Sequence, residues 1–160
     1  MKALWAPWRM EFILGDKEEG CIFCTRSQRN TDSDDLILVR GKHAFVILNK
    51  YPYSNGHLMI VPNQHTDQLG SLSPETAAEM MDFLGAFSEL LTSSLKAQGF
   101  NIGLNLGEAA GAGIQDHLHF HLVPRWVGDT NFMPVLGETK VLPEALDQTY
   151  QTLKQAWEQR

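Results

Sequence analysis

The segment 116–124 has the clearest alternation of polar and apolar residues in the chain. Its histidines are His117, His119 and His121, and the residues between and after them are Leu118, Phe120 and Leu122. Successive side chains of a strand point to opposite faces, whereas a helix would scatter both sets. The spacing therefore predicts a strand with three imidazoles on one face and an apolar face that packs into a core.

Two interpretations of this histidine strand remain open from the pattern alone. It is either a half-exposed strand that happens to be rich in histidine, or a functional surface. Neighbouring imidazoles disfavour one another's protonation, so they tend to stay uncharged near neutral pH. An uncharged imidazole is both a nucleophile and a metal ligand, which favours the functional interpretation.

Shorter apolar segments predict four further strands. The segments 36–39 and 44–48 flank a turn at 40–43, which is typical of a hairpin. The strand at 57–62 follows a stretch dense in turn-forming residues, and the strand at 100–106 precedes a glycine-rich loop.

The pattern also predicts two amphipathic helices. One begins at Ser73-Pro74-Glu75, which combines a capping serine, a proline at the first position and an acid in the first turn. Its apolar residues recur at spacings of three and four, and we expect it to end near Gly99. The other lies at the C-terminus, where five residues form one apolar stripe: Leu142, Leu146, Tyr150, Leu153 and Trp157.

Strands and long helices do not alternate one for one, so a doubly wound parallel sheet is disfavoured. We expect an α+β fold, with an antiparallel sheet of about five strands, one long helix and one C-terminal helix. A chain of 160 residues is long enough for one domain with its own core.

Composition excludes several functional classes. The net charge of −6 and the pI near 5.4 provide no basic surface for non-specific binding to nucleic acids. No apolar run approaches the length of a membrane span, and the N-terminus lacks the basic-then-apolar layout of a signal peptide. We therefore expect a cytoplasmic protein without membrane or nucleic-acid partners.

The chain has two cysteines, Cys21 and Cys24. They are too few and too close together for a secreted disulfide framework, and alone they are compatible with a redox pair, two buried thiols or metal ligands. An aromatic cluster at 4–10 precedes them, which we interpret as an arm that covers the core or a partner subunit. The polar stretch at 26–35 is expected to be an exposed loop.

Taken together, these motifs resemble those of the histidine triad (HIT) superfamily. The run from His117 to His121, reached through a glycine-rich loop, resembles the His-x-His-x-His signature. Asn49 lies eight residues before His57, and Asn105 precedes the glycine loop, in the same order as in that family. Within the superfamily the chain is most similar to bacterial diadenosine polyphosphate phosphorylase-like and hydrolase-like proteins. The segments that carry this likeness are 4–10, 48–53, 99–107 and 124–132.

The resemblance implies a fold and a domain organisation. It covers roughly residues 20–135. The whole chain, 1–160, would be a single HIT-like domain, with an arm at 1–19, a core at 20–135 and a C-terminal helix at 136–160. Family members pair through the long helix and the sheet edge, so the resemblance also implies a homodimer.

The resemblance further implies roles for individual residues. His119 would attack the α-phosphorus of a nucleotide and form a nucleotidyl-imidazole intermediate. His121 and His57 would donate hydrogen bonds to the phosphate oxygens, and Asn49 would bind the ribose hydroxyls. The other expected substrate-binding residues lie around the phosphates: Asn105, Gly111, Gly113 and His117. Gly113 stands where many family members have Gln or Ser, so the donor to the bridging oxygen is not identified by sequence.

A structural zinc is also implied by the resemblance. Some bacterial HIT proteins and the related uridylyltransferases bind zinc through a Cys-x-x-Cys pair, a histidine before the long helix and the first triad histidine. The corresponding residues, Cys21, Cys24, His65 and His117, have the ligand types of a closed tetrahedral site. Considered without the other three residues, His65 is more typical of an exposed loop histidine. Zinc on His117 would leave His119 free, and no catalytic metal is required.

Three functions follow as hypotheses. The first is a nucleotidyl hydrolase or transferase that cleaves dinucleoside polyphosphates, with diadenosine tetraphosphate as substrate and orthophosphate or water as acceptor. The second, a nucleoside phosphoramidate hydrolase, uses the same residues with another leaving group. The third is a nucleotide- or zinc-binding module without turnover, which would require that His119 is inaccessible.

Overall fold

The computed structural model describes residues 20–129 and 142–160. In chain order the elements are α2 (Ile22–Gln28), α3 (Asp32–Asp35), β1 (Ile37–Arg40), β2 (Ala44–Leu48), β3 (Leu58–Pro62), η1 (Leu69–Ser71), α4 (Pro74–Leu95), β4 (Gly99–Gly103), η2 (Glu108–Ala110), β5 (Phe120–Arg125) and α6 (Leu146–Glu158). The five strands form one antiparallel sheet, which confirms the predicted α+β class. None of the helices in these ranges has the length and apolar character needed to cross a membrane.

The sheet has the strand order β1-β2-β3-β5-β4, so the histidine strand lies beside β3 and not at an edge. The predicted hairpin of β1 and β2 is present. Between β3 and β5, Met59 lies opposite His121 and Leu58 lies opposite Leu122. Opposite residues of paired strands share a face, so this register decides which side of the sheet each histidine occupies.

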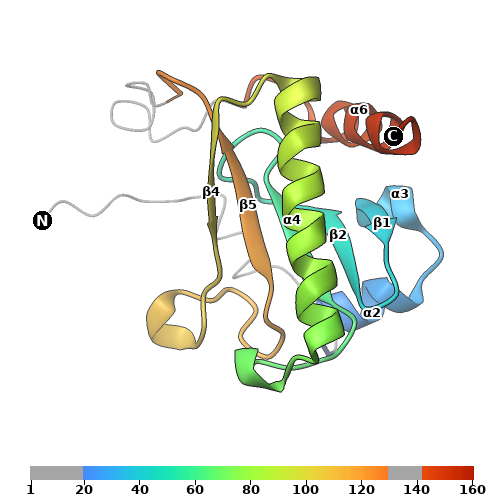
Figure 1. The fold of residues 1–160 in the computed structure, drawn as a ribbon, viewed down its shortest axis with the longest axis vertical. Coiled ribbons are helices and arrows are strands. Elements are labelled where there is room, and N and C mark those ends of the chain that lie inside the picture. Colours follow the sequence, from blue (N-terminus) through green and yellow to red (C-terminus); the bar gives the residue numbers. More distant parts are fainter. Residues whose placement is uncertain (1–19, 130–141) are drawn as a thin grey trace, which may run out of the picture.

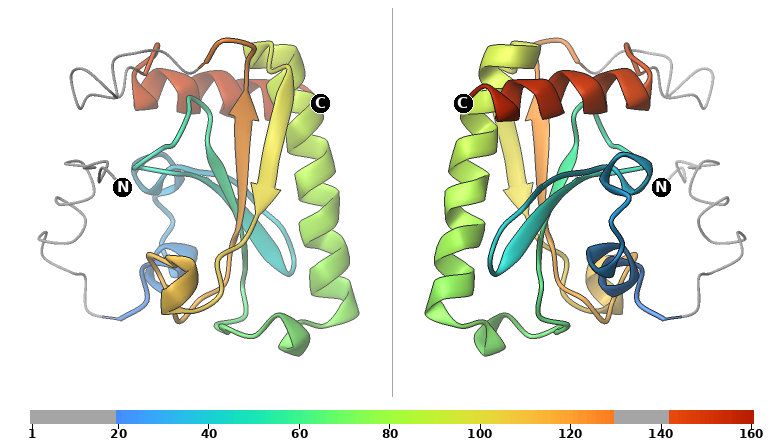
Figure 2. Two further views of the ribbon diagram at one scale, coloured as in Figure 1. Left: turned by 90° about the vertical axis from the view of Figure 1, so that its left-hand side faces the viewer. Right: turned by 90° about the vertical axis from the view of Figure 1, so that its right-hand side faces the viewer.

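Helix α4 covers one face of the sheet, and α2 lies on the other side (Figures 1 and 2). A Cβ added at Gly56, which has φ +71°, would meet the side chains of Leu95, Leu91 and Pro124 at 2.7, 3.1 and 3.5 Å. Pro124 and Leu122 therefore point towards α4. Because side chains alternate along a strand, His121 points away from α4, towards the side of α2.

Helix α6 packs beside α4 and against β1. Its Trp157 stacks on Phe87 of α4 at a ring distance of 4.6 Å, and the hydroxyl of Tyr150 donates a hydrogen bond to the carbonyl of Ile37 at 3.0 Å. The predicted apolar stripe is thus in the core from Leu146 onwards, but Leu142 precedes the helix and is partly exposed.

The prediction of an exposed loop at 26–35 is wrong. Helices α2 and α3 occupy most of this stretch, and Asp35 is buried, with a hydrogen bond from the hydroxyl of Thr31 at 2.6 Å. The guanidinium of Arg40 bonds the carbonyl oxygens at the C-terminal end of α2. The bond between Thr31 and Asp35 lies within the predicted loop, but Arg40 lies outside it, and the composition of the loop carries no signal for the contacts of Arg40.

The predicted ends of the long helix and of the strand at 100–106 also differ from the structure. Helix α4 begins as expected, with Ser73 accepting a hydrogen bond from the Thr76 amide, but it ends at Leu95 rather than near Gly99. Lys96 takes the left-handed conformation, φ +56°, that glycine usually provides at this position. The strand predicted at 100–106 is β4, which spans Gly99–Gly103. The predicted arm at 1–19 and the last residues of the predicted core, 130–135, lie outside the described residues.

Candidate active site and metal-binding set

The three triad histidines form a cluster in which His117 and His119 are buried and His121 is partly buried, and only His121 belongs to the strand. β5 begins at Phe120, because the amide of Leu118 donates to the carbonyl of Thr66 at 2.7 Å before the pairing with β3 starts. The predicted alternation holds at Leu118 and Leu122, which are buried in the core. His117 and His119 are also buried and precede β5, so the prediction of one strand that carries all three histidines is corrected here.

The nitrogen atoms of His119 have different roles. Its Nδ1 lies 2.9 Å from the carbonyl oxygen of His117. A carbonyl oxygen only accepts hydrogen bonds, so Nδ1 carries the proton. In the neutral ring Nε2 then holds the lone pair that a nucleophile needs. The ring lies 4.8 Å from that of His121.

His57 and His121 form a pair with defined tautomers. The backbone amide of Tyr53 donates to Nδ1 of His57 at 3.0 Å, so this nitrogen is an acceptor and the proton of neutral His57 is on Nε2. Nε2 of His57 lies 2.9 Å from Nδ1 of His121 and donates to it. Neutral His121 consequently carries its proton on Nε2, where it is available as a donor.

Asn49 supports the same pair. Its side-chain oxygen accepts the amide proton of Tyr51 at 2.9 Å, which orients the NH2 group towards Nδ1 of His57 at 3.3 Å. The structure therefore brings together two residues that the sequence pairs only by their spacing. Asn49 keeps a second N–H and a second oxygen lone pair for another partner.

Tyr53 is a residue of this site that sequence reasoning missed. Its ring lies 4.7 Å from that of His57 and 5.9 Å from that of His121, with interplanar angles of 38° and 31°. Tyr53 is 47% exposed, so it stands at the surface above an imidazole pair in which His57 is buried and His121 is partly buried. The preceding turn-rich stretch indicates a loop, but nothing local indicates that its tyrosine covers two histidines.

Burial keeps the triad imidazoles uncharged. Burial lowers the pKa of His119, whose hydrogen bond to the carbonyl of His117 acts in the opposite direction. Burial, and then the charge of His119, lower the pKa of His121 to about 4. Near neutral pH both rings are therefore neutral, which is the form required of a nucleophile and of a hydrogen-bond donor in this arrangement.

Four predicted metal ligands converge at the other end of the cluster. The ligand atoms of Cys21, Cys24, His65 and His117 all lie within 4.8 Å of one another. Nε2 of His117 donates to the carbonyl of Pro62 at 2.8 Å, so its Nδ1 lone pair faces the thiols. We call these four residues the Cys2His2 set.

The spacing in the Cys2His2 set fits a tetrahedral metal ion. Nδ1 of His117 lies 3.3 Å from Sγ of Cys21 and 3.6 Å from Sγ of Cys24, and Nδ1 of His65 lies 3.4 Å from Sγ of Cys24. Zinc–sulfur bonds of about 2.3 Å and zinc–nitrogen bonds of about 2.0 Å at tetrahedral angles separate the two ligand atoms by about 3.5 Å. The donor types and the distances both match zinc.

Both ring nitrogens of His117 are therefore engaged, by Pro62 and by the Cys2His2 set. The side chain of His117 thus has no further ring nitrogen to offer in this arrangement, and its predicted substrate-binding role stays a prediction. Asn105 is half-buried after β4, and Gly111 and Gly113 are exposed beyond η2. Within the described ranges, no hydrogen bond links any of these three residues to a triad histidine, and their substrate-binding roles stay predictions.

Comparison with known proteins agrees with this geometry. The model of the HIT domain matches residues 30–127. The chain belongs to the HIT family. An AP-4-A phosphorylase of Mycobacterium tuberculosis is 35% identical over an alignment that spans 98% of this chain and 85% of that protein. An adenosine 5'-monophosphoramidase of Saccharomyces cerevisiae is 29% identical over 68% of this chain and 64% of its own length.

Solved structures of HIT proteins share the fold. A Zn-bound histidine triad family protein from Mycobacterium smegmatis superposes with a TM-score of 0.71 and 28% identity, over 88% of this chain and 94% of that one. In the present HIT protein the Cys2His2 set offers four ligand atoms to a metal ion. The resemblance of the triad motif to this family is thus confirmed.

Proposed function

We propose that this HIT protein cleaves dinucleoside polyphosphates, with diadenosine tetraphosphate as substrate and His119 as nucleophile. The similarity to the mycobacterial AP-4-A phosphorylase over 98% of the chain supports the substrate class. The observation that carries the mechanism is the hydrogen bond from Nδ1 of His119 to the carbonyl of His117, because it leaves the lone pair on Nε2.

The reaction has two steps. In the first, Nε2 of His119 attacks the α-phosphorus, a P–N bond forms, and the P–O bond to the departing ATP breaks. His121 donates a hydrogen bond from its Nε2–H to the leaving oxygen, where negative charge develops as ATP departs as the anion, and His57 holds the opposite nitrogen of that ring. In the second step, orthophosphate or water attacks the phosphorus and the P–N bond breaks, which yields ADP or AMP.

Substrate binding uses the residues around these histidines. Asn49 binds the ribose hydroxyls with the hydrogen-bonding capacity that His57 and Tyr51 leave unused. Asn105 and the backbone amides of Gly111 and Gly113 surround the phosphates. The left-handed conformation of Gly111, φ +78°, supports this role, since such turns orient amides towards anions.

A structural zinc ion is the second part of the proposal. Cys21, Cys24, His65 and His117 would hold it, and it would supply a rigid link between these segments. The Zn-bound neighbour from M. smegmatis supports the assignment. The chemical steps above need only the imidazoles.

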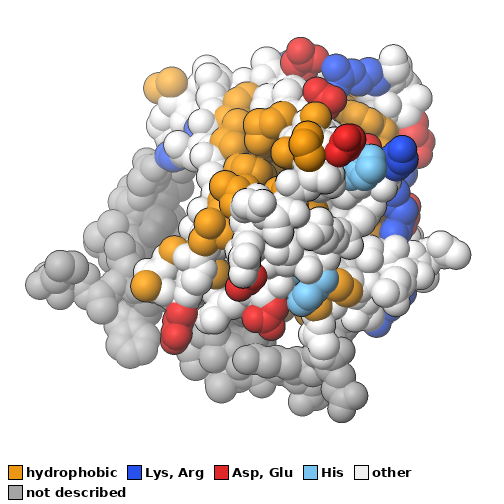
Figure 3. All heavy atoms as spheres, turned by 60° about the horizontal axis from the view of Figure 1, so that its bottom comes forward, with side chains coloured by type: hydrophobic (Ala, Val, Ile, Leu, Met, Phe, Trp, Pro, Cys, Tyr) orange, Lys and Arg blue, Asp and Glu red, His pale blue; other side chains and the backbone are white. Residues whose placement is uncertain are grey.

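The third part of the proposal is a homodimer formed through α4 and β4, which is an edge strand among the described residues. An unpaired edge strand exposes backbone donors and acceptors that a second copy can satisfy. Met81 of α4 and Ile102 of β4 are large hydrophobic residues exposed in the single chain, each by 51%. Hydrophobic side chains gather over one region of the surface in Figure 3 rather than being spread evenly.

A phosphoramidate hydrolase is the alternative function. The similarity to the yeast adenosine 5'-monophosphoramidase supports it, and it would use the same nucleophile. A module without turnover is the third possibility, and the exposure of His119, only 5%, is the observation that favours it. The nucleotide products of the reaction distinguish these three functions.

The experiment incubates the zinc-containing protein with diadenosine tetraphosphate, with and without orthophosphate, and separates the nucleotides by chromatography. ADP plus ATP identifies a phosphorylase, and AMP plus ATP identifies a hydrolase. Cleavage of adenosine 5'-phosphoramidate alone would move the assignment to the alternative function. No cleavage of either compound would overturn the proposal.

His119→Ala tests the nucleophile. We expect the rate to fall by about 10³-fold or more while nucleotide binding persists. His43→Gln is the matched control, because this histidine lies in the β1–β2 turn outside the triad. Retained cleavage in His119→Ala, or an equal loss in the control, would contradict the assignment.

A further inference from the structure

One side chain touches both the Cys2His2 set and the proposed nucleophile. Phe23 lies between the two cysteines in sequence and is fully buried. Its ring lies 5.4 Å from the ring of His117 and 5.0 Å from the ring of His119. Sequence reasoning gave Phe23 no role.

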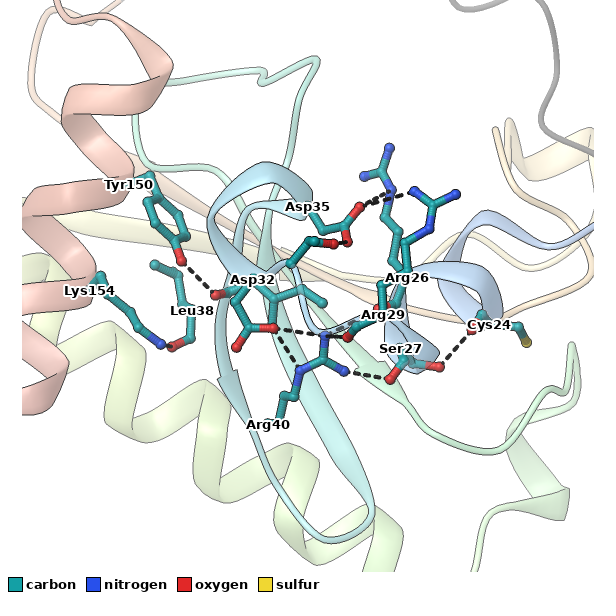
Figure 4. A network of polar contacts seen from close by, with 12 residues as sticks. Cys24, Arg26, Ser27, Arg29, Asp32, Asp35, Leu38, Arg40, Tyr150 and Lys154 are labelled. Carbon is teal, nitrogen blue, oxygen red and sulfur yellow. Dashed lines mark hydrogen bonds and ion pairs between the residues drawn. The ribbon is translucent and has the colours of Figure 1, made fainter.

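The helix that carries Phe23 is attached at its two ends. Cys21 is the N-cap of α2 and Cys24 lies in its first turn, so the Cys2His2 set holds the N-terminal end. At the other end the guanidinium of Arg40 donates to carbonyl oxygens in the last turn and just beyond it (Figure 4). Those oxygens belong to Arg26 at 3.1 Å, Ser27 at 2.5 Å and Arg29 at 2.8 Å.

A helix of seven residues is not stable by itself, so these attachments decide where α2 lies. Arg40 is itself held by Asp32, at 2.8 Å from Nε. The C-terminal attachment is thus complete within the protein, whereas the N-terminal attachment consists of two thiols and two imidazoles that a metal ion would join.

We propose that Phe23 is a positioning residue that makes the orientation of His119 depend on metal binding at the Cys2His2 set. With the metal bound, α2 presses the Phe23 ring against His119 while the carbonyl of His117 holds its Nδ1 proton. Without the metal, the start of α2 and the ring of His117 lose their common anchor, and His119 samples other orientations and the other tautomer. This inference rests on the proposed function only for its kinetic readout.

The experiment compares four states of the full-length protein: wild type and Phe23→Leu, each with zinc and after zinc removal by a chelator. Two quantities are measured in each state. The first is the tautomer of His119, from the ¹⁵N shifts of its imidazole. The second is kcat for diadenosine tetraphosphate.

In wild type, zinc removal should convert a single Nδ1–H tautomer into a mixture and lower kcat by roughly ten- to a hundredfold, reversibly on adding zinc back. Phe23→Leu should show the same two changes with zinc still bound, as checked by elemental analysis. Zinc removal from this variant should lower kcat by no more than about twofold further, because the two changes break one coupling. KM should stay within about twofold of wild type throughout.

Phe87→Leu is the matched control. Phe87 is also fully buried, but it stacks on Trp157 on the α4 side of the sheet. The Phe87→Leu variant should lose about as much thermal stability as Phe23→Leu. On zinc removal it should still show the full changes in kcat and in the His119 tautomer. Phe23→Met, which preserves more of the volume, replaces Phe23→Leu if that variant does not fold.

Three results would overturn the inference: independent, multiplicative losses from zinc removal and Phe23→Leu, an unchanged His119 tautomer in zinc-free wild type, or full activity in Phe23→Leu. A wild-type protein that cleaves no nucleotide would refute the proposed function instead. The tautomer measurement would still decide the role of Phe23 in that case.

Discussion

Nε2 of His57, directly before β3, donates a hydrogen bond to Nδ1 of His121 in β5 at 2.9 Å. The amide of Tyr53 sets the tautomer of His57, and His57 in turn sets that of His121. A backbone group thus determines where the proton of His121 lies. The residue expected to donate a hydrogen bond to the leaving group is oriented before any substrate binds.

His57→Leu should lower kcat/KM by about 10²- to 10³-fold, because His121 loses the partner that keeps its proton on Nε2. The measurement is steady-state cleavage of diadenosine tetraphosphate. The double variant His57→Leu/His121→Gln should have a kcat/KM only a little lower than that of either single variant, since the two rings act as one unit. Simple multiplication of the two losses would show that the rings act separately.

Tyr53→Phe should keep kcat/KM within about twofold of wild type, because the contact with His57 and His121 is made by the ring. Tyr53→Ala should lower it by roughly tenfold and raise the pKa of His121 towards its ordinary value, because water reaches the imidazole pair. The measurement is the pH dependence of kcat/KM in the three proteins. Equal losses in both variants would instead assign the effect to the hydroxyl.

Stability should fall in mild acid through His121. Its folded-state pKa of about 4 lies below the unfolded value of about 6.5, so between these values the unfolded chain takes up a proton that the folded protein does not. This contribution is fully present above about pH 6.5 and is lost as the pH falls towards 4, by at most about 3 kcal/mol.

Urea unfolding at about pH 7 and about pH 4.5 measures this loss, with His121→Gln as the comparison. The variant should lose less stability between the two pH values, because it has no imidazole at this position. An identical loss in the variant would show that other groups cause the acid sensitivity.

Elemental analysis should find about one zinc ion per chain, and Cys21→Ser should lose it and unfold at lower temperature. Ser27→Ala is a suitable control, because Ser27 is in the same helix and its hydroxyl bonds only the carbonyl of Cys24 among the described contacts. A protein purified without metal that is equally stable and active would contradict the zinc assignment.

Some parts of the site were predictable because they depend on short-range periodicity. The alternation from His117 to Leu122 correctly separated the core residues Leu118 and Leu122 from the imidazoles, since side chains alternate in any extended segment. Family motifs correctly grouped the Cys2His2 set, although its members are up to 96 residues apart. Local sequence propensity did not predict the helices α2 and α3. Both are held by Arg40, which donates hydrogen bonds to the carbonyl oxygens at the end of α2 and to Asp32 of α3.

The sequence by itself determined the five-stranded antiparallel sheet, the long helix and the identity of the three imidazoles, because hydrophobic periods and the order of motifs can both be read along the chain. Only the tertiary structure decided that His119 is buried beneath Phe23, that Tyr53 covers two histidines, and that His117 has no nitrogen left for substrate. These relationships depend on the β3–β5 register and on where α2 is held, and both are set by contacts between residues far apart in the chain.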